Sequence, residues 1–182
     1  DLLRVSAVWR GKGVSDKALA PGSYHDPSRK TLGGQFPAPP PAGKLWLGHA
    51  IIPGWQLGTK VDHTDPRSPA PSPEEVGRGP IPTSLGQFKS VELVGQDVVL
   101  TYRVADATIR ELWKTSEHEG HIVIERHLSV SAHGKDLLLV VGARHQGPSQ
   151  EIETGVTVSG PAELVPDDEF FVVKLPTNVA PA

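Results

Sequence analysis

The chain has 182 residues, a net charge of −3, and neither cysteine nor methionine. This length is enough for one sizeable domain with a hydrophobic core. The absence of cysteine excludes disulfides, thiolate catalysis, Cys-ligated zinc, iron–sulfur clusters and a c-type haem attachment site, and the absence of methionine excludes a thioether haem ligand. The basic residues are scattered, which argues against nucleic-acid binding, and no apolar run approaches the roughly 18 residues of a membrane helix.

The N-terminal part of the chain, residues 1–87, is dominated by loops. Thirteen of the eighteen prolines lie between Pro21 and Pro82. Proline removes a backbone donor and fixes φ, so it interrupts regular strands. Two apolar segments are strand candidates in this part: residues 2–9 (LLRVSAVW) and residues 45–52 (LWLGHAII).

Two long Pro/Gly-rich loops follow these segments, at residues 11–44 and 53–87. Loops of this length are uncommon inside a compact domain, and those that occur are usually functional, packed as coverings, or flexible. One short helix is expected at residues 72–75, because Ser72 fits the N-cap position and Pro73 the first helical position.

The C-terminal part, residues 88–182, has the period-2 patterning of strands. Val98, Leu100, Tyr102 and Val104, for example, alternate with more polar neighbours. Turn signals such as Gly95-Gln96-Asp97 recur every 8–12 residues, which is typical of an antiparallel meander in a sandwich or barrel. Strands are expected at residues 88–94, 98–104, 108–114, 121–131, 137–143, 151–159 and 169–175. The sequence therefore predicts an all-β, antiparallel β-sandwich that forms a single domain over residues 1–182.

Four of the eight histidines gather in residues 117–136 (EHEGHIVIERHLSVSAHGKD). On a strand, His121, Glu125 and His127 share one face, so they are the candidate metal ligands. Two ligands from one strand need others from elsewhere, and a polar outer face is normal for an antiparallel sheet. The interpretation that we favour is therefore an ordinary sheet exterior without a metal.

The opposite face of the same strand is apolar except for Arg126. An arginine among Ile122, Ile124 and Leu128 is expected to pair with an acid or to extend its charged end to the sheet edge. In the same stretch, His133 and Gly134 are expected to form the tip of a hairpin that leads to the strand at residues 137–143.

The first long loop contains one candidate catalytic pair, His25 and Asp26. A histidine beside a carboxylate can act as a general acid or base. Adjacent residues rarely reach the geometry that this requires, however, and Asp26-Pro27 is also a common start of a turn. The pair therefore remains an alternative to a structural turn.

Trp55 is the candidate ligand-binding residue of the second long loop, where it lies in Pro-Gly-Trp-Gln-Leu-Gly. This setting predicts a sharply bent loop. Indole faces stack on sugar rings, so an exposed Trp55 could form a carbohydrate platform with Trp46, Trp9 and Tyr24. The alternative is a tryptophan that fills the core beneath the loop.

Acidic residues offer a further metal hypothesis. Asp62, Asp65 and the run from Asp167 to Glu169 could supply oxygen ligands to calcium. Their spacing matches no defined calcium loop, so exposed charge is the interpretation that we favour.

Four segments resemble a known family: LLRVSAVWRGKG (2–13), ALAPGSYHDPSRKT (18–31), IIPGWQLG (51–58) and PAPSPEEVGRGPIP (69–82). They are similar to an uncharacterised domain of bacterial PVC-type haem-binding proteins of planctomycetes and verrucomicrobia, over residues 2–144. There the domain accompanies cytochrome c modules and propellers that resemble sugar dehydrogenases.

This resemblance implies a periplasmic or extracellular location and a fragment of a larger multidomain protein. The lack of an initiator Met and of a signal peptide fits a processed chain. Any haem would be held elsewhere in the parent protein, because this chain has no CxxCH motif, so no cofactor is expected here. The resemblance supplies no catalytic residues.

Three functions stay open. The leading hypothesis is a non-catalytic accessory module that binds a carbohydrate or a neighbouring cytochrome c or propeller domain. The second is a carbohydrate-active enzyme whose acid–base groups come from His25, Asp26 or the face of Glu125 and His127. The third is a structural packing module, which requires a large apolar patch on one face.

Overall fold

The computed structural model describes residues 2–11, 43–69, 78–144 and 155–178, and all its regular elements are antiparallel strands. The predicted all-β fold is therefore confirmed. Within these residues there is no helix that could cross a membrane. The strands are β1 (Ala7–Gly11), β2 (Gly43–Gly48), β3 (Trp55–Leu57), β4 (Gly86–Val94), β5 (Asp97–Val104), β6 (Ala107–His118), β7 (His121–Val130), β8 (Leu137–Ala143), β9 (Glu163–Val165) and β10 (Phe170–Leu175).

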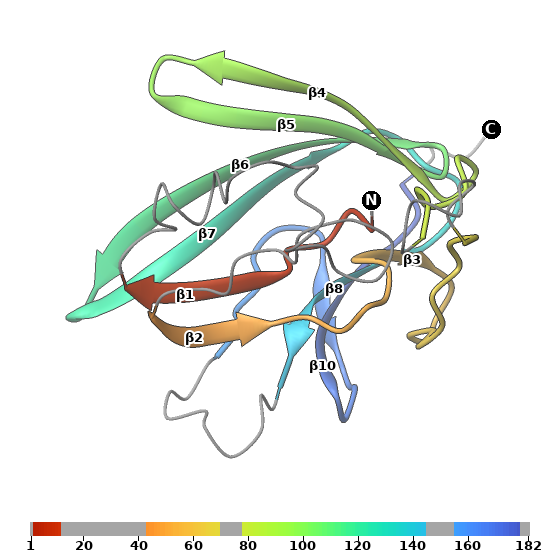
Figure 1. The fold of residues 1–182 in the computed structure, drawn as a ribbon. Coiled ribbons are helices and arrows are strands. Elements are labelled where there is room, and N and C mark those ends of the chain that lie inside the picture. Colours follow the sequence, from red (N-terminus) through yellow and green to blue (C-terminus); the bar gives the residue numbers. More distant parts are fainter. Residues whose placement is uncertain (1, 12–42, 70–77, 145–154, 179–182) are drawn as a thin grey trace, which may run out of the picture.

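The strands form two four-stranded sheets and a hairpin. One sheet has the order β4-β5-β6-β7, a meander in which each strand pairs with the next in sequence. The second has the order β3-β8-β10-β9, and β1 pairs with β2. Figure 1 shows the meander as a long, curved sheet over the shorter second sheet, with the β1–β2 hairpin beside them. The architecture is consistent with a β-sandwich.

Period-2 alternation gives the meander an inner and an outer face. The register pairs Tyr102 with Ile109 and Trp113 with Arg126, so these side chains point to the same side. That side is the inner face, because Tyr102 and Ile109 are buried in the core. The expectation that Arg126 shares the apolar face of β7 is confirmed.

The main core lies between the two sheets. Its buried residues come from both of them and include Val104, Ile109, Leu137, Leu139 and Trp55. Burial of such side chains is the main favourable term in folding. The inner face of the meander is buried here at the end near Val104, whereas Leu93, near the tip of the β4–β5 hairpin, is 80% exposed.

Strand β8 is apolar on both faces because both are covered. Leu137 and Leu139 face the main core, while Leu138 and Val140 belong to a second cluster with Ile52 on the opposite side. An unbroken apolar run such as LLLVVGA is typical of a strand buried on both sides. This explains why the run at residues 137–143 lacks clean alternation.

The β1–β2 hairpin is held against β8 by a close contact. A Cβ atom on Gly142 would lie 2.5 Å from Cγ of Leu47 and 2.8 Å from the carbonyl oxygen of Gly48. Only glycine leaves room for the backbone of β2 at this distance. Gly142 therefore fixes the position of the hairpin that carries Trp9.

Three expectations about the elements were wrong. Trp55 lies in strand β3, paired with Leu139 of β8, and not in a sharply bent loop. Residues 155–159 are not in a strand, and β9 (Glu163–Val165) follows instead. The first difference arises because β3 pairs with the distant strand β8, which local patterns do not report. The short helix expected at residues 72–75 lies outside the described residues.

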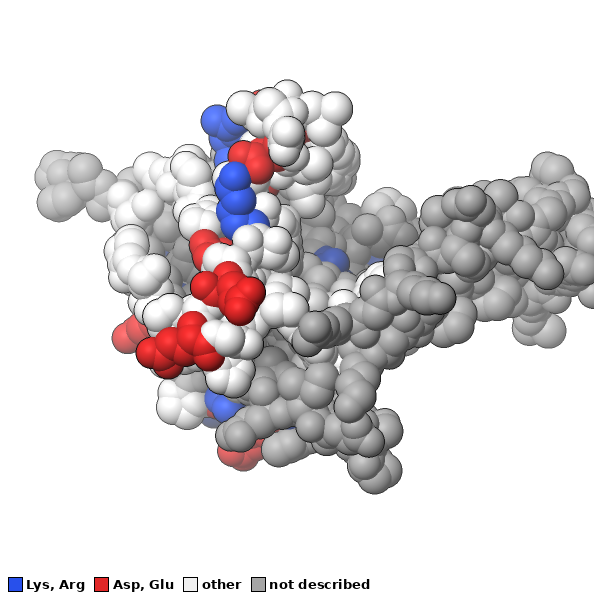
Figure 2. Space-filling view, turned by 90° about the vertical axis from the view of Figure 1, so that its left-hand side faces the viewer, with Lys and Arg blue, Asp and Glu red and all other residues white. Residues whose placement is uncertain are grey.

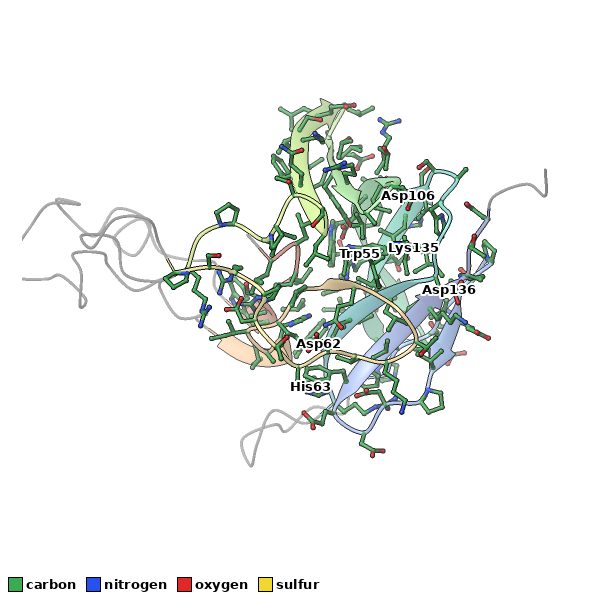
Figure 3. The ribbon with its side chains drawn as sticks, turned by 90° about the vertical axis from the view of Figure 1, so that its right-hand side faces the viewer. Trp55, Asp62, His63, Asp106, Lys135 and Asp136 are labelled. Carbon is green, nitrogen blue, oxygen red and sulfur yellow. The ribbon has the colours of Figure 1, made fainter. Side chains whose placement is uncertain are left out.

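The third error concerns His133. The segment between β7 and β8 crosses from one sheet to the other, so it is not a hairpin. The backbone N–H of His133 donates to the side-chain oxygen of Asn178 (2.8 Å), and the imidazole is 3% exposed. His133 is thus buried beneath the C-terminal segment. Figure 3 shows Asp106, Lys135 and Asp136 around this crossing, where Asp106 accepts a hydrogen bond from the backbone N–H of Gly134.

The outer face of the meander carries paired charges. Arg110 contacts Glu92 (3.2 Å), and Lys114 contacts Asp97 (2.7 Å). Figure 2 shows a narrow band of basic and acidic side chains on one side of the molecule. Exposed ion pairs of this kind contribute little to stability, about 0–1 kcal/mol each. They keep this face polar, as the period-2 pattern predicts.

Replacing Leu138 by alanine is expected to lower the free energy of unfolding by about 2–5 kcal/mol, because it leaves a cavity in a close-packed cluster. Leu93→Ala is the matched control, since Leu93 is almost fully exposed, and it should change stability by less than about 0.5 kcal/mol. Urea denaturation of both variants measures the difference. Equal losses would contradict the placement of the core.

Candidate functional site

A cavity of about 450 Å³ lies between the N-terminal segment and the inner face of the meander. The segment from Leu3 to Trp9 lines one side of it. All four strands of the meander line the other side, with side chains that include Phe88, Tyr102, Glu111, Trp113 and Arg126. We call this cavity the groove. Its volume lies in the range of small-ligand sites.

The groove exists because the inner face of the meander is longer than the sheet that covers it. Along β6, Ile109 is fully buried in the core, Glu111 is 3% exposed, and Trp113 is half-buried. Successive inward-facing side chains of β6 thus lie first in the core and then in the groove. On β4, Phe88 is 52% exposed and forms part of the lining.

The other wall is held in place by a glycine. The backbone N–H of Gly54 donates to the carbonyl oxygen of Leu2 (3.0 Å). A Cβ atom on Gly54 would lie 2.4 Å from the carbonyl oxygen of Leu3 and 2.7 Å from Cα of Arg4. Because glycine permits this approach, the N-terminal segment runs close against the sheet and brings Arg4 to the groove.

A chain of buried hydrogen bonds borders the groove. The indole N–H of Trp55 donates to the hydroxyl oxygen of Tyr102 (3.0 Å), and that hydroxyl donates to Oε2 of Glu111 (2.5 Å). Nε–H of Arg126 donates to Oε1 of Glu111 (2.8 Å). The guanidinium of Arg126 also lies over the ring of Trp113, 4.8 Å from its centroid. We call these five residues the polar chain.

The polar chain offsets the free-energy cost of burying the carboxylate of Glu111. An isolated carboxylate in an apolar interior would lose several kcal/mol of hydration, so it must be paired and hydrogen-bonded. Glu111 has both an ion pair with Arg126 and a hydroxyl donor. Burial, together with the neighbouring charge of Glu111, raises the pKa of Tyr102, so the phenol stays protonated and continues to donate.

Positive charge predominates around the groove. Burial lowers the pKa of Arg4, and the nearby charge of Arg67 lowers it further. The described hydrogen bond of Arg4 goes from Nη1 to the carbonyl oxygen of His49 (3.3 Å), which is a neutral acceptor. No carboxylate among the described residues pairs with Arg4.

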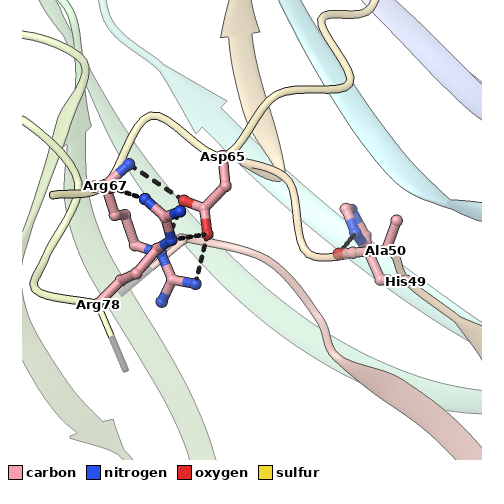
Figure 4. A network of polar contacts seen from close by, with 5 residues as sticks. All are labelled: His49, Ala50, Asp65, Arg67 and Arg78. Atoms are coloured by element: carbon pink, nitrogen blue, oxygen red, sulfur yellow. Dashed lines mark hydrogen bonds and ion pairs between the residues drawn. The ribbon is translucent and has the colours of Figure 1, made fainter. Parts of the chain in front are cut away.

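In a neighbouring cluster, the carboxylate of Asp65 contacts two arginines. Arg67 donates two side-chain hydrogen bonds to Asp65 (3.0 and 2.9 Å), and Arg78 lies 3.5 Å from the same carboxylate (Figure 4). These hydrogen bonds from Arg67 lower the pKa of Asp65 to about 2. Asp65 is therefore ionised at neutral pH, and its charge is shared by two guanidinium groups.

His49 lies beside Arg4 and strand β8. Its Nδ1 lies 2.9 Å from the carbonyl oxygen of Ala50 and its Nε2 lies 3.1 Å from that of Val140. Burial lowers the pKa of His49, the two carbonyl contacts oppose this, and the charges of Arg4 and Arg126 lower it further. The net direction is a pKa below the ordinary value.

The structure does not form the expected tryptophan platform. Trp55 is 4% exposed and lies between the two sheets, with its indole in the core (Figure 3). It therefore presents no face to a ligand, and the core-filling alternative describes it. Trp46 is half-buried in β2 and does not line the groove, whereas Trp9 does. Tyr24 lies outside the described residues, as do His25 and Asp26.

The candidate metal ligands of β7 lie on the outer face. Nε2 of His127 is 2.8 Å from Oε2 of Glu125, and the hydroxyl of Ser116 donates to Oε1 of the same carboxylate (2.6 Å). His121 is exposed at the end of the same row. No group of three or more metal-ligating side chains occurs in the part of the chain that the structure describes.

The acidic candidates for calcium have local partners instead. Asp62 accepts a hydrogen bond from the backbone N–H of Thr64 (2.9 Å). Hydrogen bonding by the side chain of Thr64, together with this backbone contact, lowers the pKa of Asp62. Asp167 accepts hydrogen bonds from the backbone N–H groups of Glu169 (3.0 Å) and Phe170 (2.7 Å). These carboxylates thus stabilise turns.

Sequence reasoning missed Glu111 as a member of the site. The expectation that Arg126 pairs with an acid is confirmed, but Glu111 was not recognised as that acid. One signal was available, since Glu111 lies between Ile109 and Trp113 on a predicted apolar face. A lone acid and a lone base on inner faces of adjacent strands are natural partners.

Comparison with known proteins places the chain in a family. Residues 1–111 match the family described as "Domain of unknown function (DUF6797)". The match covers 111 of the 182 residues, so the chain belongs to this family. No curated protein and no solved structure matches the chain.

Replacing Tyr102 by phenylalanine is expected to lower the free energy of unfolding by about 1–3 kcal/mol. The change removes the hydroxyl that joins Trp55 to Glu111 and leaves both groups without this partner. Urea denaturation measures the loss. Ser129→Ala, on the exposed outer face of β7, is the control and should change stability by less than about 0.5 kcal/mol. If Tyr102→Phe is as stable as the wild type, the polar chain does not stabilise the fold.

His49 is expected to make the fold sensitive to acid. Its folded-state pKa lies below the ordinary value of 6.5, so below about pH 6.5 the unfolded chain binds a proton that the folded chain does not. The free energy of unfolding therefore falls as the pH drops through 6.5. His49→Gln should lose less stability than the wild type between about pH 7.5 and about pH 5.5. Urea titrations at both pH values test this, with exposed His121→Gln as the control that should match the wild type.

Proposed function

We propose that this DUF6797 domain is a non-catalytic accessory module that binds a saccharide in the groove between the N-terminal segment and the β4–β7 sheet. One observation carries the proposal. Three aromatic side chains, Trp9, Phe88 and Trp113, line a cavity of about 450 Å³ together with an ion pair and a phenol. Aromatic surface and a few fixed polar groups are the usual composition of a small-molecule site.

The chemistry of a sugar suits this lining. The C–H face of a pyranose packs against aromatic rings, while its hydroxyl groups need donors and acceptors. Arg126 is a donor at the groove, and Glu111 and Tyr102 hold it in one orientation. A preorganised donor of this kind costs little side-chain entropy when a ligand binds.

A carbohydrate-active enzyme is less well supported. Glycoside hydrolysis typically uses two carboxyl groups that flank the scissile bond. Glu111 is the one carboxylate among the described residues that line the groove, and both its oxygens accept hydrogen bonds. The enzyme hypothesis would need His25 and Asp26, which lie outside the described residues.

Docking of a partner domain is the second candidate, and exposed apolar surface favours it. Phe88, Val91, Leu93 and Val98 are exposed on the β4–β5 hairpin, and Ile122 is exposed on β7. The register places all five on the inner face, and four of them, Val91, Leu93, Val98 and Ile122, lie outside the lining of the groove. Apolar surface of this kind is typical of interaction sites.

The setting that we propose is a larger exported protein. The four segments that resemble PVC-type haem-binding proteins support a periplasmic or extracellular location. In that setting a cytochrome c or propeller domain would be the neighbour for docking, and any haem would be held outside this chain, which has no cysteine.

Titration with neutral tetrasaccharides of glucose, mannose and xylose tests saccharide binding. At least one of them should bind, as measured by calorimetry and tryptophan fluorescence. Phe88→Ala should weaken that binding about two- to twelvefold, since an aromatic contact contributes about 0.5–1.5 kcal/mol. Leu93→Ala, on the same face of the same strand, is the matched control and should bind like the wild type.

The same titrations separate the two candidates. If neither these tetrasaccharides nor acidic ones bind to the folded protein, saccharide binding is refuted and docking of a partner is favoured. If binding occurs but Phe88→Ala and Leu93→Ala weaken it equally, the ligand does not lie in the groove.

A further inference from the structure

The described lining of the groove holds more positive than negative charge. It contains two arginines, Arg4 and Arg126, and one carboxylate, Glu111. Both oxygens of Glu111 are already hydrogen-bonded within the polar chain, one by Arg126 and one by Tyr102. Glu111 therefore balances Arg126 but leaves the charge of Arg4 without a carboxylate among the described residues.

Among the described residues, the neighbouring cluster does not supply the missing negative charge. The carboxylate of this cluster, Asp65, is shared by Arg67 and Arg78. Arg4 itself donates to a neutral carbonyl oxygen, that of His49, and burial and the charge of Arg67 lower its pKa. Arg4 and Arg126 both line the groove.

Glu111 occupies only part of the hydrogen-bonding capacity of Arg126. Its described ion pair with Glu111 involves Nε alone, at 2.8 Å. A guanidinium has five N–H donors, and its planar fork suits the paired oxygens of a carboxylate or a sulfate. An incoming anion could thus bind Arg126 without breaking the pair with Glu111.

We infer that the groove selects saccharides that carry an anionic group, a uronate carboxylate or a sulfate ester, and that Arg4 and Arg126 bind this group. The inference rests on the proposed function, because it names the class of saccharide for the same site. A neutral sugar would shield Arg4 from water without providing a counter-charge, which costs free energy. An anionic sugar removes that cost and forms charge-assisted hydrogen bonds.

The test compares tetrasaccharides that differ only in charge. A tetramer of galacturonic acid is titrated beside its fully methyl-esterified form, which has the same rings and linkages but no carboxylates. A sulfated galactose tetramer and its desulfated form make the second pair. Calorimetry on the full chain at low salt should give at least tenfold tighter binding of one acidic form than of its neutral partner. This preference should shrink in about 0.5 M salt.

Variants locate the preference at Arg4. Arg4→Gln should reduce the preference for the acidic form to within about threefold of equality, while Arg4→Lys should retain part of it because the charge remains. Arg110→Gln is the matched control, since Arg110 is exposed on the outer face and pairs with Glu92. Thermal unfolding of each variant, followed by circular dichroism, checks that it is folded. If Arg4→Gln does not fold, a loss of the preference in Arg4→Lys to half or less supports the assignment and an unchanged preference overturns it.

The outcomes separate the inference from the proposed function. If acidic and neutral forms bind equally, the inference is overturned while saccharide binding stands. If neither form binds but a tetrasaccharide of glucose, mannose or xylose does, the inference is overturned while saccharide binding stands, and if no tetrasaccharide binds, both fail. If the acidic form is preferred but folded Arg4→Gln keeps the full preference, Arg4 does not select the charge and the inference is also overturned.

Discussion

The buried carboxylate of Glu111 is the constraint on which the arrangement of this domain depends. It lies at 3% exposure on the inner face of β6, where an unpaired charge would destabilise the fold. The polar chain around it runs from Trp55 on β3 through Tyr102 on β5 to Arg126 on β7. It therefore joins the two sheets as well as three strands of the meander. A non-directional apolar core would not impose such a specific registration.

Glu111 also marks the point where the core ends and the groove begins. On one side of it, Ile109 packs against the second sheet. On the other side, Trp113 faces the groove, because the second sheet is too short to cover the whole meander. The wall opposite is provided by the N-terminal segment, which depends on the missing side chain of Gly54. The proposed site is thus a direct consequence of two sheets of unequal length.

The charges of the domain are divided between its two faces. On the outer face of the meander, acids and bases are paired and exposed, as for Arg110 and Glu92. Around the groove, arginines outnumber the acids among the described residues, and Asp65 and Glu111 are each committed to arginine. The excess of positive charge therefore lies on the face that contains the groove. This shared location connects the proposed saccharide binding with the inferred selection for an anionic group.

Much of the fold could be predicted from the sequence, because the period-2 pattern of residues 88–143 is a local property. It predicted strands close to β4, β5, β6 and β7, while an unbroken apolar run predicted β8, and it placed Arg126 on the apolar face of β7. It did not predict β3, in which Trp55 enters the core. It also did not show that the chain crosses between sheets at His133. These features depend on partners far away in the chain, and local alternation carries no information about such partners.

The sequence by itself thus determined the all-β class, the strands of the meander and the side of each strand that faces inward, since side-chain direction alternates along any strand. Only the tertiary structure decided that Trp55 is buried, that Glu111 is the partner of Arg126, and that Arg4 reaches the same groove. Those outcomes depend on which distant segments approach one another. That approach is set by long-range packing, such as the contact of the N-terminal segment with Gly54.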